Sequence, residues 1–403
     1  MKVLVVGSGG REHALAWKLS QSPELTELHA APGNPGIAQL GTCHPVRPED
    51  ADSLLGLCRE HSFDLVVVGP EVPLVVGVAD HLRHAGCSVF GPSAAAARIE
   101  GSKSFAKDVM ASAEVPAAKP LAIARPPCVV KVDGLAAGKG VFVCRTEQEL
   151  EAGLVSASAY GGPIVIEELL QGEEVSVFAL SDGRTAVPLA AARDYKQIDD
   201  GDRGPNTGGM GSFAPVSEVD LEELVERVHR PVLAELAQRG TPFVGVLFAG
   251  LMLTQDGPRV LEFNCRLGDP EAQAILPLLE GDVLEAFAAA AAGHVGSASL
   301  SIGDRGAVTV VLAGRDYPDR PDTGTPIEGV AEAEALGALV FHAGTAVQGD
   351  RLVTSGGRIL NVTAVGESVP DARTRAYEAV GRISFDGMRH RRDIAAKAEH
   401  VRA

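Results

Sequence analysis

Short apolar runs alternate with amphipathic segments through the first hundred residues of the chain. The apolar runs predict strands, and the amphipathic segments predict helices. The predicted strands are 3–6, 65–68 and 88–90, and the predicted helices are 11–20, 52–60 and 75–85. Strands that alternate with helices are typical of an α/β fold with a doubly wound parallel sheet. Glycine-rich turns follow these strands at their carboxyl ends, where such sheets bind ligands.

The pattern becomes mixed beyond this first region. Helices are expected at 93–111, 147–156, 220–239 and 370–383, the third of them starting in a capping box at Ser217-x-x-Asp220. Strands are expected within 128–144, at 164–168, 175–180 and 186–191, and in a hairpin of 245–254 and 259–264. A glycine-rich loop is expected at 201–211.

The charge and the cysteines narrow the classes of partner and compartment. The formal net charge is −17, and no block of Lys and Arg is long enough to follow a phosphate backbone. We therefore expect no nucleic-acid and no membrane partner. The six cysteines lack a CxxC pair, which favours reduced thiols. The apolar run at the start is too short for a signal peptide, so a soluble, cytoplasmic protein is expected.

The run Gly7–His13, GSGGREH, follows a strand and opens a helix. Backbone N–H groups at such a helix start can hold a phosphate or another anion. The run fails the dinucleotide fingerprint, because Glu12 stands where the third glycine would be. A tight turn without a ligand explains the motif equally well.

The run Lys131–Gly140, KVDGLAAGKG, is more informative. A strand delivers Lys131, and a loop of small residues delivers Lys139. Small side chains let the backbone close over a polyphosphate while two ammonium groups neutralise it. The spacing is not that of a Walker loop, so a mobile hairpin lid is the better interpretation. A plain surface hairpin is less favoured, because Lys131 lies within an apolar strand.

The run Leu261–Glu271, LEFNCRLGDPE, carries the sharpest signal. Alternation along a strand puts Glu262 and Asn264 on one face. A carboxylate and an amide oxygen are hard ligands that suit Mg²⁺. Arg266 follows and can clamp a phosphoryl group with two hydrogen bonds.

Two further segments are polar and less specific. In Ile166–Glu174, strand-edge groups can contact a nucleoside, although a solvated strand end is the simpler interpretation without context. In Arg193–Pro215, a loop of this length is usually functional, with Asp194, Lys196 and Asn206 as polar contacts and disorder as the competing interpretation.

Taken in order, these segments resemble the ATP-grasp superfamily and, within it, the glycinamide ribonucleotide synthetase family. The resemblance runs from end to end and is most specific in GPNTGGMG at 204–211 and RLGDPEAQ at 266–273. It implies an ATP-grasp architecture with a Rossmann-like substrate domain at 1–100 and an ATP-grasp domain at 101–300. The lid subdomain is expected at about 115–170, and a small mixed α/β carboxyl-terminal domain at 301–403.

The implied activity is that of a carbon–nitrogen ligase in de novo purine biosynthesis. It joins glycine to 5-phosphoribosylamine through a glycyl phosphate, giving glycinamide ribonucleotide, ADP and phosphate. ATP and Mg²⁺ (or Mn²⁺) are the implied cofactors, the two substrates are the implied small-molecule partners, and a monomer is expected. Three alternatives stay open: another ATP-grasp ligase such as a biotin-dependent carboxylase subunit, a nicotinamide-dependent oxidoreductase, and a non-catalytic nucleotide-binding module.

The resemblance also implies roles for individual residues. The expected catalytic residues are Arg266, Lys139, Asp194 and Lys196. The expected ATP contacts are Lys103, Lys131, Gly134, Gly138, Gly140, Glu168, Leu170 and Glu174, with Leu170 acting through its backbone. The expected metal ligands are Glu262 and Asn264. The expected substrate contacts are Gly9, Gly10, Glu71, Asn206, Gly208, Gly209, Asp269, Pro270 and Arg358.

Two features depart from the family pattern. The segment between Pro116 and Cys128 is short and lacks the helix that normally precedes the lysine strand, so a trimmed lid is expected. The strand at 245–253 carries no carboxylate, which leaves open whether one or two metal ions bind.

Overall fold

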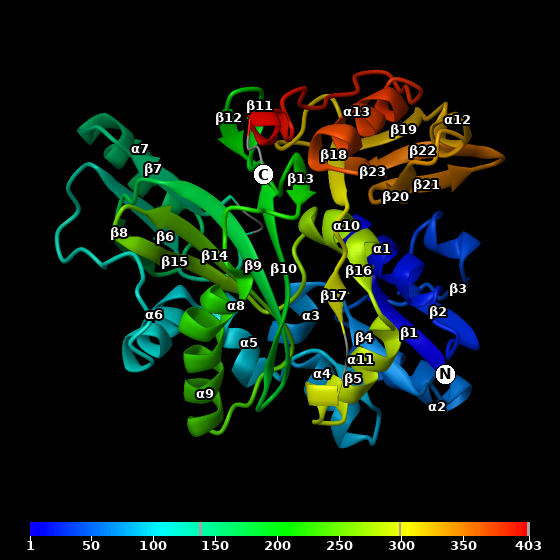
Figure 1. Ribbon diagram of the computed structural model, residues 1–403, viewed down its shortest axis with the longest axis horizontal. Coiled ribbons are helices and arrows are strands. Elements are labelled where there is room, and N and C mark those ends of the chain that lie inside the picture. The colour runs from blue at the N-terminus through cyan, green and yellow to red at the C-terminus, as the bar shows by residue number, and fades with distance from the viewer. Residues whose placement is uncertain (137–138, 298–299, 401–403) are drawn as a thin grey trace.

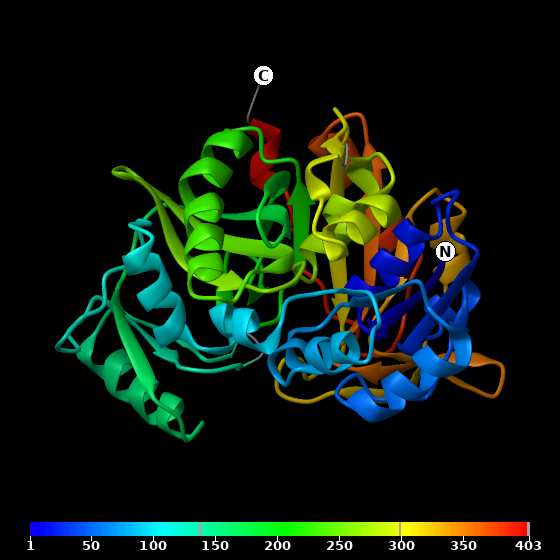
Figure 2. The same cartoon turned by 90° about the horizontal axis from the view of Figure 1, so that it is seen from below.

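The computed structural model describes residues 1–136, 139–297 and 300–400. Its main sheets lie in a row: a long central sheet has the amino-terminal sheet on one side and a small three-stranded sheet on the other (Figure 1). The view from below shows the same order, with the small sheet and its helix at one end of the molecule (Figure 2). Within the described residues, none of the helices is both long and apolar enough to cross a membrane.

The amino-terminal sheet is parallel, with strand order β3-β2-β1-β4-β5. Its strands are β1 (Lys2–Gly7), β2 (Glu27–Pro32), β3 (Thr42–Cys43), β4 (Leu65–Val68) and β5 (Val89–Phe90). Its helices are α1 (Gly10–Leu19), α2 (Ala51–His61), α3 (Glu71–Val75) and α4 (Val78–His84). Side chains of β1 alternate between two apolar cores, one on each face of the sheet. Val5 packs in one core with Leu15 of α1, and Leu4 packs in the other with Leu54 of α2. The predicted doubly wound sheet is therefore confirmed.

The small sheet has the order β7-β6-β8 and its own apolar core. It consists of β6 (Cys128–Val132), β7 (Val141–Cys144) and β8 (Ile164–Glu168), covered by α7 (Glu147–Ser158). The chain from 114 to 127 reaches β6 without a helix, as the sequence predicts. We call this unit the lid sheet.

The long sheet has eight strands in the order β15-β14-β9-β10-β13-β18-β23-β20. They are β9 (Glu173–Asp182), β10 (Ala186–Asp194), β13 (Gly211–Ala214), β14 (Val244–Thr254), β15 (Gly257–Asn264), β18 (Gly306–Ala313), β20 (Leu339–His342) and β23 (Arg358–Gly366). All of its pairings are antiparallel. Strands from both sides of residue 300 thus share one sheet, joined where β13 pairs with β18.

The remaining elements cover these sheets or lie at their edges. The helices are α5 (Ala94–Gly101), α6 (Lys103–Ser112), α8 (Leu221–Leu224), the π-helical turn η2 (Val225–His229), α9 (Arg230–Gln238), α10 (Glu271–Ile275), α11 (Val283–Ala291), α12 (Val330–Glu334) and α13 (Val369–Val380). The short strands are β11 (Gln197–Asp199), β12 (Arg203–Asn206), β16 (Leu279–Glu280), β17 (Ser301–Ile302), β19 (Asp322–Pro326), β21 (Thr345–Gln348) and β22 (Arg351–Gly356). The 3-10 turns are η1 (Ile37–Gln39), η3 (Leu276–Leu278), η4 (Val295–Ser297) and η5 (Ala396–His400).

Four local predictions are wrong, each for a local reason. The helix at 75–85 is split because Gly77 adopts a φ of 91°. The helix at 93–111 is split at Ser102, whose extended backbone lets its hydroxyl cap α6. The capping box at 217–220 is absent, because Asp220 itself is the N-cap and accepts from the Glu223 amide. The loop at 201–211 contains β12, which pairs with β11 in a hairpin.

Candidate active site

A cleft lies between α6, the lid sheet, the end of β15 and the loops that follow β10 and β13. Its lining includes the apolar side chains of Met110, Leu135, Val141, Phe248 and Phe263. The rest is dense in charged side chains: Arg11, Glu71, Glu100, Lys103, Lys107, Lys131, Glu167, Asp194, Lys196, Glu262, Arg266, Asp269, Glu271 and Arg358. A cleft that combines apolar side chains with opposed charges suits a ligand with a flat ring and a polyanionic tail.

The charged part begins at a buried carboxylate shared by two lysines. Glu167 of β8 receives Lys131 of β6 at 2.8 Å and Lys107 of α6 at 2.8 Å. The ammonium of Lys131 also donates to the carbonyl of Leu261 at 2.8 Å, and so links the lid sheet to the long sheet. Burial is the main cause that lowers the pKa of Lys107, although Glu167 opposes it. Both lysines are paired with a carboxylate, and this pairing offsets the cost of burying their charges before an anionic ligand binds.

The predicted metal ligands lie on the same side of β15. Glu262 is opposite Gly250 and Asn264 is opposite Phe248 in the pairing with β14, and both residues line the cleft. A Cβ at position 250 would lie 3.4 Å from Cγ of Glu262, so these two positions are neighbours across the pairing of β14 with β15. The predicted one-face arrangement of Glu262 and Asn264 is confirmed.

A second acidic cluster faces these two residues. The Lys196 ammonium lies 2.7 Å from Glu174 and 3.2 Å from Asp194. Burial lowers the pKa of Lys196, but Asp194, Glu174 and Glu262 outweigh it and raise that pKa well above its usual value. Burial, and then the nearby Asp194, raise the pKa of Glu271 to about 7. The oxygen donors gathered here are those that a hard divalent cation prefers, so the residues fit Mg²⁺ or Mn²⁺.

Arg266 is held between two carboxylates. Its Nε lies 3.1 Å from Oε2 of Glu71, and its Nη2 lies 3.0 Å from Oε1 of Glu100. The other oxygen of Glu100 accepts from the Cys265 amide at 2.8 Å. Burial raises the pKa of Glu71, but Arg266 and Arg11 outweigh it and lower that pKa to about 2. The guanidinium therefore has a defined orientation along the cleft wall.

Arg358 joins the two sequence runs that carry the most specific resemblance. It donates to the carbonyl of Gly208 at 2.5 Å and to that of Asp269 at 2.7 Å, and its Nη2 lies 3.1 Å from the Asp269 carboxylate. Gly209 adopts a φ of 107°, and a Cβ there would lie only 2.5 Å from Cδ of Pro270. The close approach of these two segments thus requires glycine at position 209.

Most of the predicted site residues therefore meet at this cleft. Those that line it are Lys103, Lys131, Gly134, Gly140, Asp194, Lys196, Glu262, Asn264, Arg266, Glu71, Gly208, Asp269 and Arg358. Glu174, Gly209 and Pro270 contact residues of this wall.

Other predicted residues lie away from the wall. Lys139 donates to the carbonyl of Pro318 at 2.7 Å, and Glu168 pairs with Arg259 at 2.7 Å. The amide of Gly9 donates to Glu12 at 2.7 Å, so a carboxylate of the chain takes the position expected for a phosphate. Gly10 packs on Asn361, Leu170 follows β8, and Asn206 ends β12. Gly138 lies outside the described residues, and the roles assigned to all of these residues stay predictions.

Sequence reasoning missed five charged residues of the cleft: Arg11, Glu100, Lys107, Glu167 and Glu271. Lys107 follows Lys103 by four residues on one helix, a spacing that could have indicated a shared face. Glu167 was missed because successive side chains of a strand point to opposite faces, so the pair Glu167-Glu168 offers one carboxylate to each face. Glu100 gave no signal, since it reaches Arg266 only through the tertiary fold.

The comparisons with known proteins cover nearly the whole chain. Family models described as phosphoribosylglycinamide synthetase match it at residues 1–100 (N domain), 101–272 (ATP-grasp (A) domain) and 307–397 (C domain). A phosphoribosylamine–glycine ligase from Streptomyces coelicolor is 50% identical over 99% of each chain. The crystal structure of such a ligase from Thermotoga maritima has a TM-score of 0.85 at 35% identity, covering 98% of this chain and 100% of that one.

A more distant structure shows the fold alone. The biotin carboxylase of Campylobacter jejuni has a TM-score of 0.70 at 14% identity, over 96% of this chain and 92% of that one.

Proposed function

Because the chain belongs to the phosphoribosylglycinamide synthetase family, and as a carbon–nitrogen ligase joins glycine to phosphoribosylamine in purine biosynthesis, we propose that it activates glycine as glycyl phosphate in the cleft described above. ATP is the proposed phosphoryl donor, bound between the lid sheet and the long sheet.

One observation carries this proposal: Lys131 spans the two sheets. Its ammonium is buried, pairs with Glu167 and donates to the carbonyl of Leu261, the residue before the proposed metal ligand Glu262. A cation at this position would neutralise a polyphosphate bound near Glu262 and Asn264. The same geometry explains why the strand that carries a lysine is otherwise apolar.

The residues of the first step act by position and charge. Lys131, Lys107 and Lys103 all line the cleft, and Lys103 lies at the start of α6. Glu262 and Asn264 would hold Mg²⁺ or Mn²⁺, which neutralises phosphate charge when bound. A carboxylate oxygen of glycine bonds to the γ-phosphorus, the bond from that phosphorus to the β,γ-bridging oxygen breaks, and ADP leaves with the electron pair.

The second step is the transfer of the glycyl group. The amine nitrogen of phosphoribosylamine bonds to the acyl carbon, the bond from that carbon to the phosphate oxygen breaks, and the nitrogen loses one proton to solvent. Arg266 is positioned by Glu71 and Glu100 to face the departing phosphate. We assign the contact with the sugar phosphate to Arg358 and to the loop at Gly208, to which Arg358 is hydrogen-bonded. The carboxylate of Asp269 orients Arg358.

The intermediate is tested by positional isotope exchange. ATP labelled with ¹⁸O at the β,γ-bridge is incubated with the enzyme, Mg²⁺ and glycine in the absence of phosphoribosylamine. Reversible formation of glycyl phosphate moves the label into the non-bridging β positions, and omission of glycine prevents this movement. The contradicting result is an enzyme preparation that catalyses ligation but leaves the label in the bridge. The label would stay there both without phosphoribosylamine and with a slowly reacting amine in its place.

We also propose that the enzyme acts as a cytoplasmic monomer on small molecules. All six cysteines are free thiols, which agrees with a reducing compartment. Light scattering coupled to size exclusion should give one chain per particle at assay concentration. A dimer that persists on dilution would contradict the monomer.

A further inference from the structure

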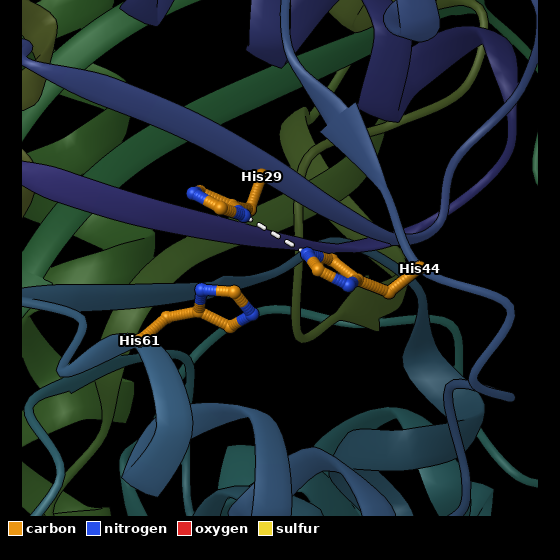
Figure 3. A group of neighbouring side chains, drawn as sticks. All are labelled: His29, His44 and His61. Atoms are coloured by element: carbon orange, nitrogen blue, oxygen red, sulfur yellow. Dashed lines mark hydrogen bonds between the residues drawn. The ribbon is translucent and has the colours of Figure 1, made fainter.

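Three histidines come together at the edge of the amino-terminal sheet, away from the cleft. His29 lies on β2, His44 directly follows β3, and His61 ends α2. Nδ1 of His29 and Nε2 of His44 are 2.9 Å apart, and one ligand nitrogen from each of the three rings lies within 4.8 Å of the others. Figure 3 shows the three rings around a common space, with His61 facing the bonded pair.

The spacing of these nitrogens is close to that of a metal site. Zinc binds imidazole nitrogen at about 2.0–2.1 Å, so two nitrogens in a tetrahedral site are roughly 3.4 Å apart. That value falls between the 2.9 Å of the His29–His44 contact and the 4.8 Å that bounds the group. To bind one ion, the His29–His44 contact would have to widen by about 0.5 Å, and the widest separation would have to close by at most about 1.4 Å.

The surroundings of His29 orient its ring. Nε2 of His29 lies 3.4 Å from the carboxylate of Glu27, which fixes Nδ1 as the nitrogen that faces the cluster. A carboxylate behind a histidine is the usual outer partner of a metal-binding imidazole.

We propose that His29, His44 and His61 bind a divalent transition-metal ion, with zinc as the best-suited ion and water in the fourth position. Three imidazoles are borderline ligands that suit zinc and disfavour Mg²⁺, so this site and the oxygen-rich cleft select different ions. The ion would join β2, the segment after β3 and the end of α2. Its effect is therefore on the amino-terminal domain, and the proposal does not depend on the proposed reaction intermediate.

The site can be tested by zinc binding to the full chain in excess Mg²⁺, which occupies the oxygen-donor sites. The test variant is the double substitution His44→Gln and His61→Gln, whose side chains are only half-buried and so can be exchanged without opening the core. The matched control is His81→Gln, which removes an exposed histidine that lies 3.1 Å from Asp52 in the same domain. Isothermal titration gives the number and affinity of the bound ions.

We expect the wild type and the control each to bind one zinc ion. The double variant should bind zinc at least about 100-fold more weakly, because even the loss of one outer partner of a metal site lowers the metal affinity by about 10- to 100-fold. Zinc should raise the unfolding temperature of the wild type and of the control but not that of the double variant. Cobalt should give the visible spectrum of a tetrahedral site with no thiolate charge-transfer band. Equal zinc affinity and stoichiometry in all three proteins, or a thiolate band that survives in the double variant, would overturn the proposal.

Discussion

Replacing Arg266 by Met should destabilise the protein strongly, because the guanidinium is enclosed with two carboxylates. The pKa of Glu71, against an ordinary value of 4.5, is about 2 despite burial, which raises it. That difference corresponds to roughly 3 kcal/mol of favourable charge interaction, shared between Arg266, Arg11 and hydrogen bonds. Glu100 would lose its partner as well, and breaking a buried pair costs about 3–5 kcal/mol. We expect a loss of about 3–5 kcal/mol at pH 7.5.

The sign of the pH dependence follows from the same carboxylates. A depressed pKa contributes stability that is complete above pH 4.5 and is lost as the pH falls towards 2. In the Arg266→Met protein the share of this contribution that Arg266 supplies is gone, and Glu100, whose pKa burial already raises, is free to take up a proton. The destabilisation relative to the wild type should therefore be smaller at pH 5 than at pH 7.5.

The assay is urea unfolding followed through Trp17, the single tryptophan, with circular dichroism as a second probe of two-state behaviour. Arg259→Met is the matched control, because Arg259 makes one partly exposed pair with Glu168 and should cost at most about 1 kcal/mol. Removing Glu100 together with Arg266 should cost less than the sum of the single changes. If Arg266→Met costs no more than the control, the enclosed-charge argument is wrong.

Three further substitutions probe the cleft. Glu262→Gln should raise the Mg²⁺ concentration that gives the half-maximal rate by about 10- to 100-fold and leave the unfolding midpoint unchanged. If the Mg²⁺ dependence is also unchanged, Glu262 is not a metal ligand. Lys131→Met should lower the steady-state rate of ADP release by roughly 100-fold. The fold should be preserved, because Lys107 still neutralises Glu167. If the variant fails to fold, Lys131 has a structural role instead. Because burial raises the pKa of Glu271 to about 7, its charged form opposes folding increasingly as the pH rises from 4.5 through 7. Relative to the wild type, Glu271→Gln should therefore gain about 2 kcal/mol between pH 5.5 and 8 in urea unfolding, and a flat difference would contradict the raised pKa.

The parts of the fold that local pattern controls could be predicted from the sequence. The strand at 65–68 was predicted residue for residue as β4, because four consecutive apolar residues between turns allow few other structures. The one-face placement of Glu262 and Asn264 followed from strand alternation alone. The break between α5 and α6 was missed, because Ser102 serves both helices at once, as the C-cap of α5 and the N-cap of α6.

The parts that depend on distant contacts could not be predicted. Arg266 was expected to face phosphates, and nothing in the sequence indicated that Glu71 and Glu100 would hold it from two other elements. The choice between Glu167 and Glu168 depends on which face of β8 turns towards α6, and that is fixed by packing of the lid sheet. The histidine cluster draws on three elements separated by up to 32 residues, so no spacing rule would have found it.

The continuous long sheet sets a limit on how this chain can be divided. β13 is fully buried and pairs along its whole length with β18, whereas it shares only two register pairs with β10. A protein fragment that stopped near residue 300 would lack β18 and would leave β13 as an unprotected apolar edge, a site for self-association with other fragments. Co-expression with the missing carboxyl-terminal piece would restore that edge, so the two halves of a split enzyme should reassemble through one strand pairing.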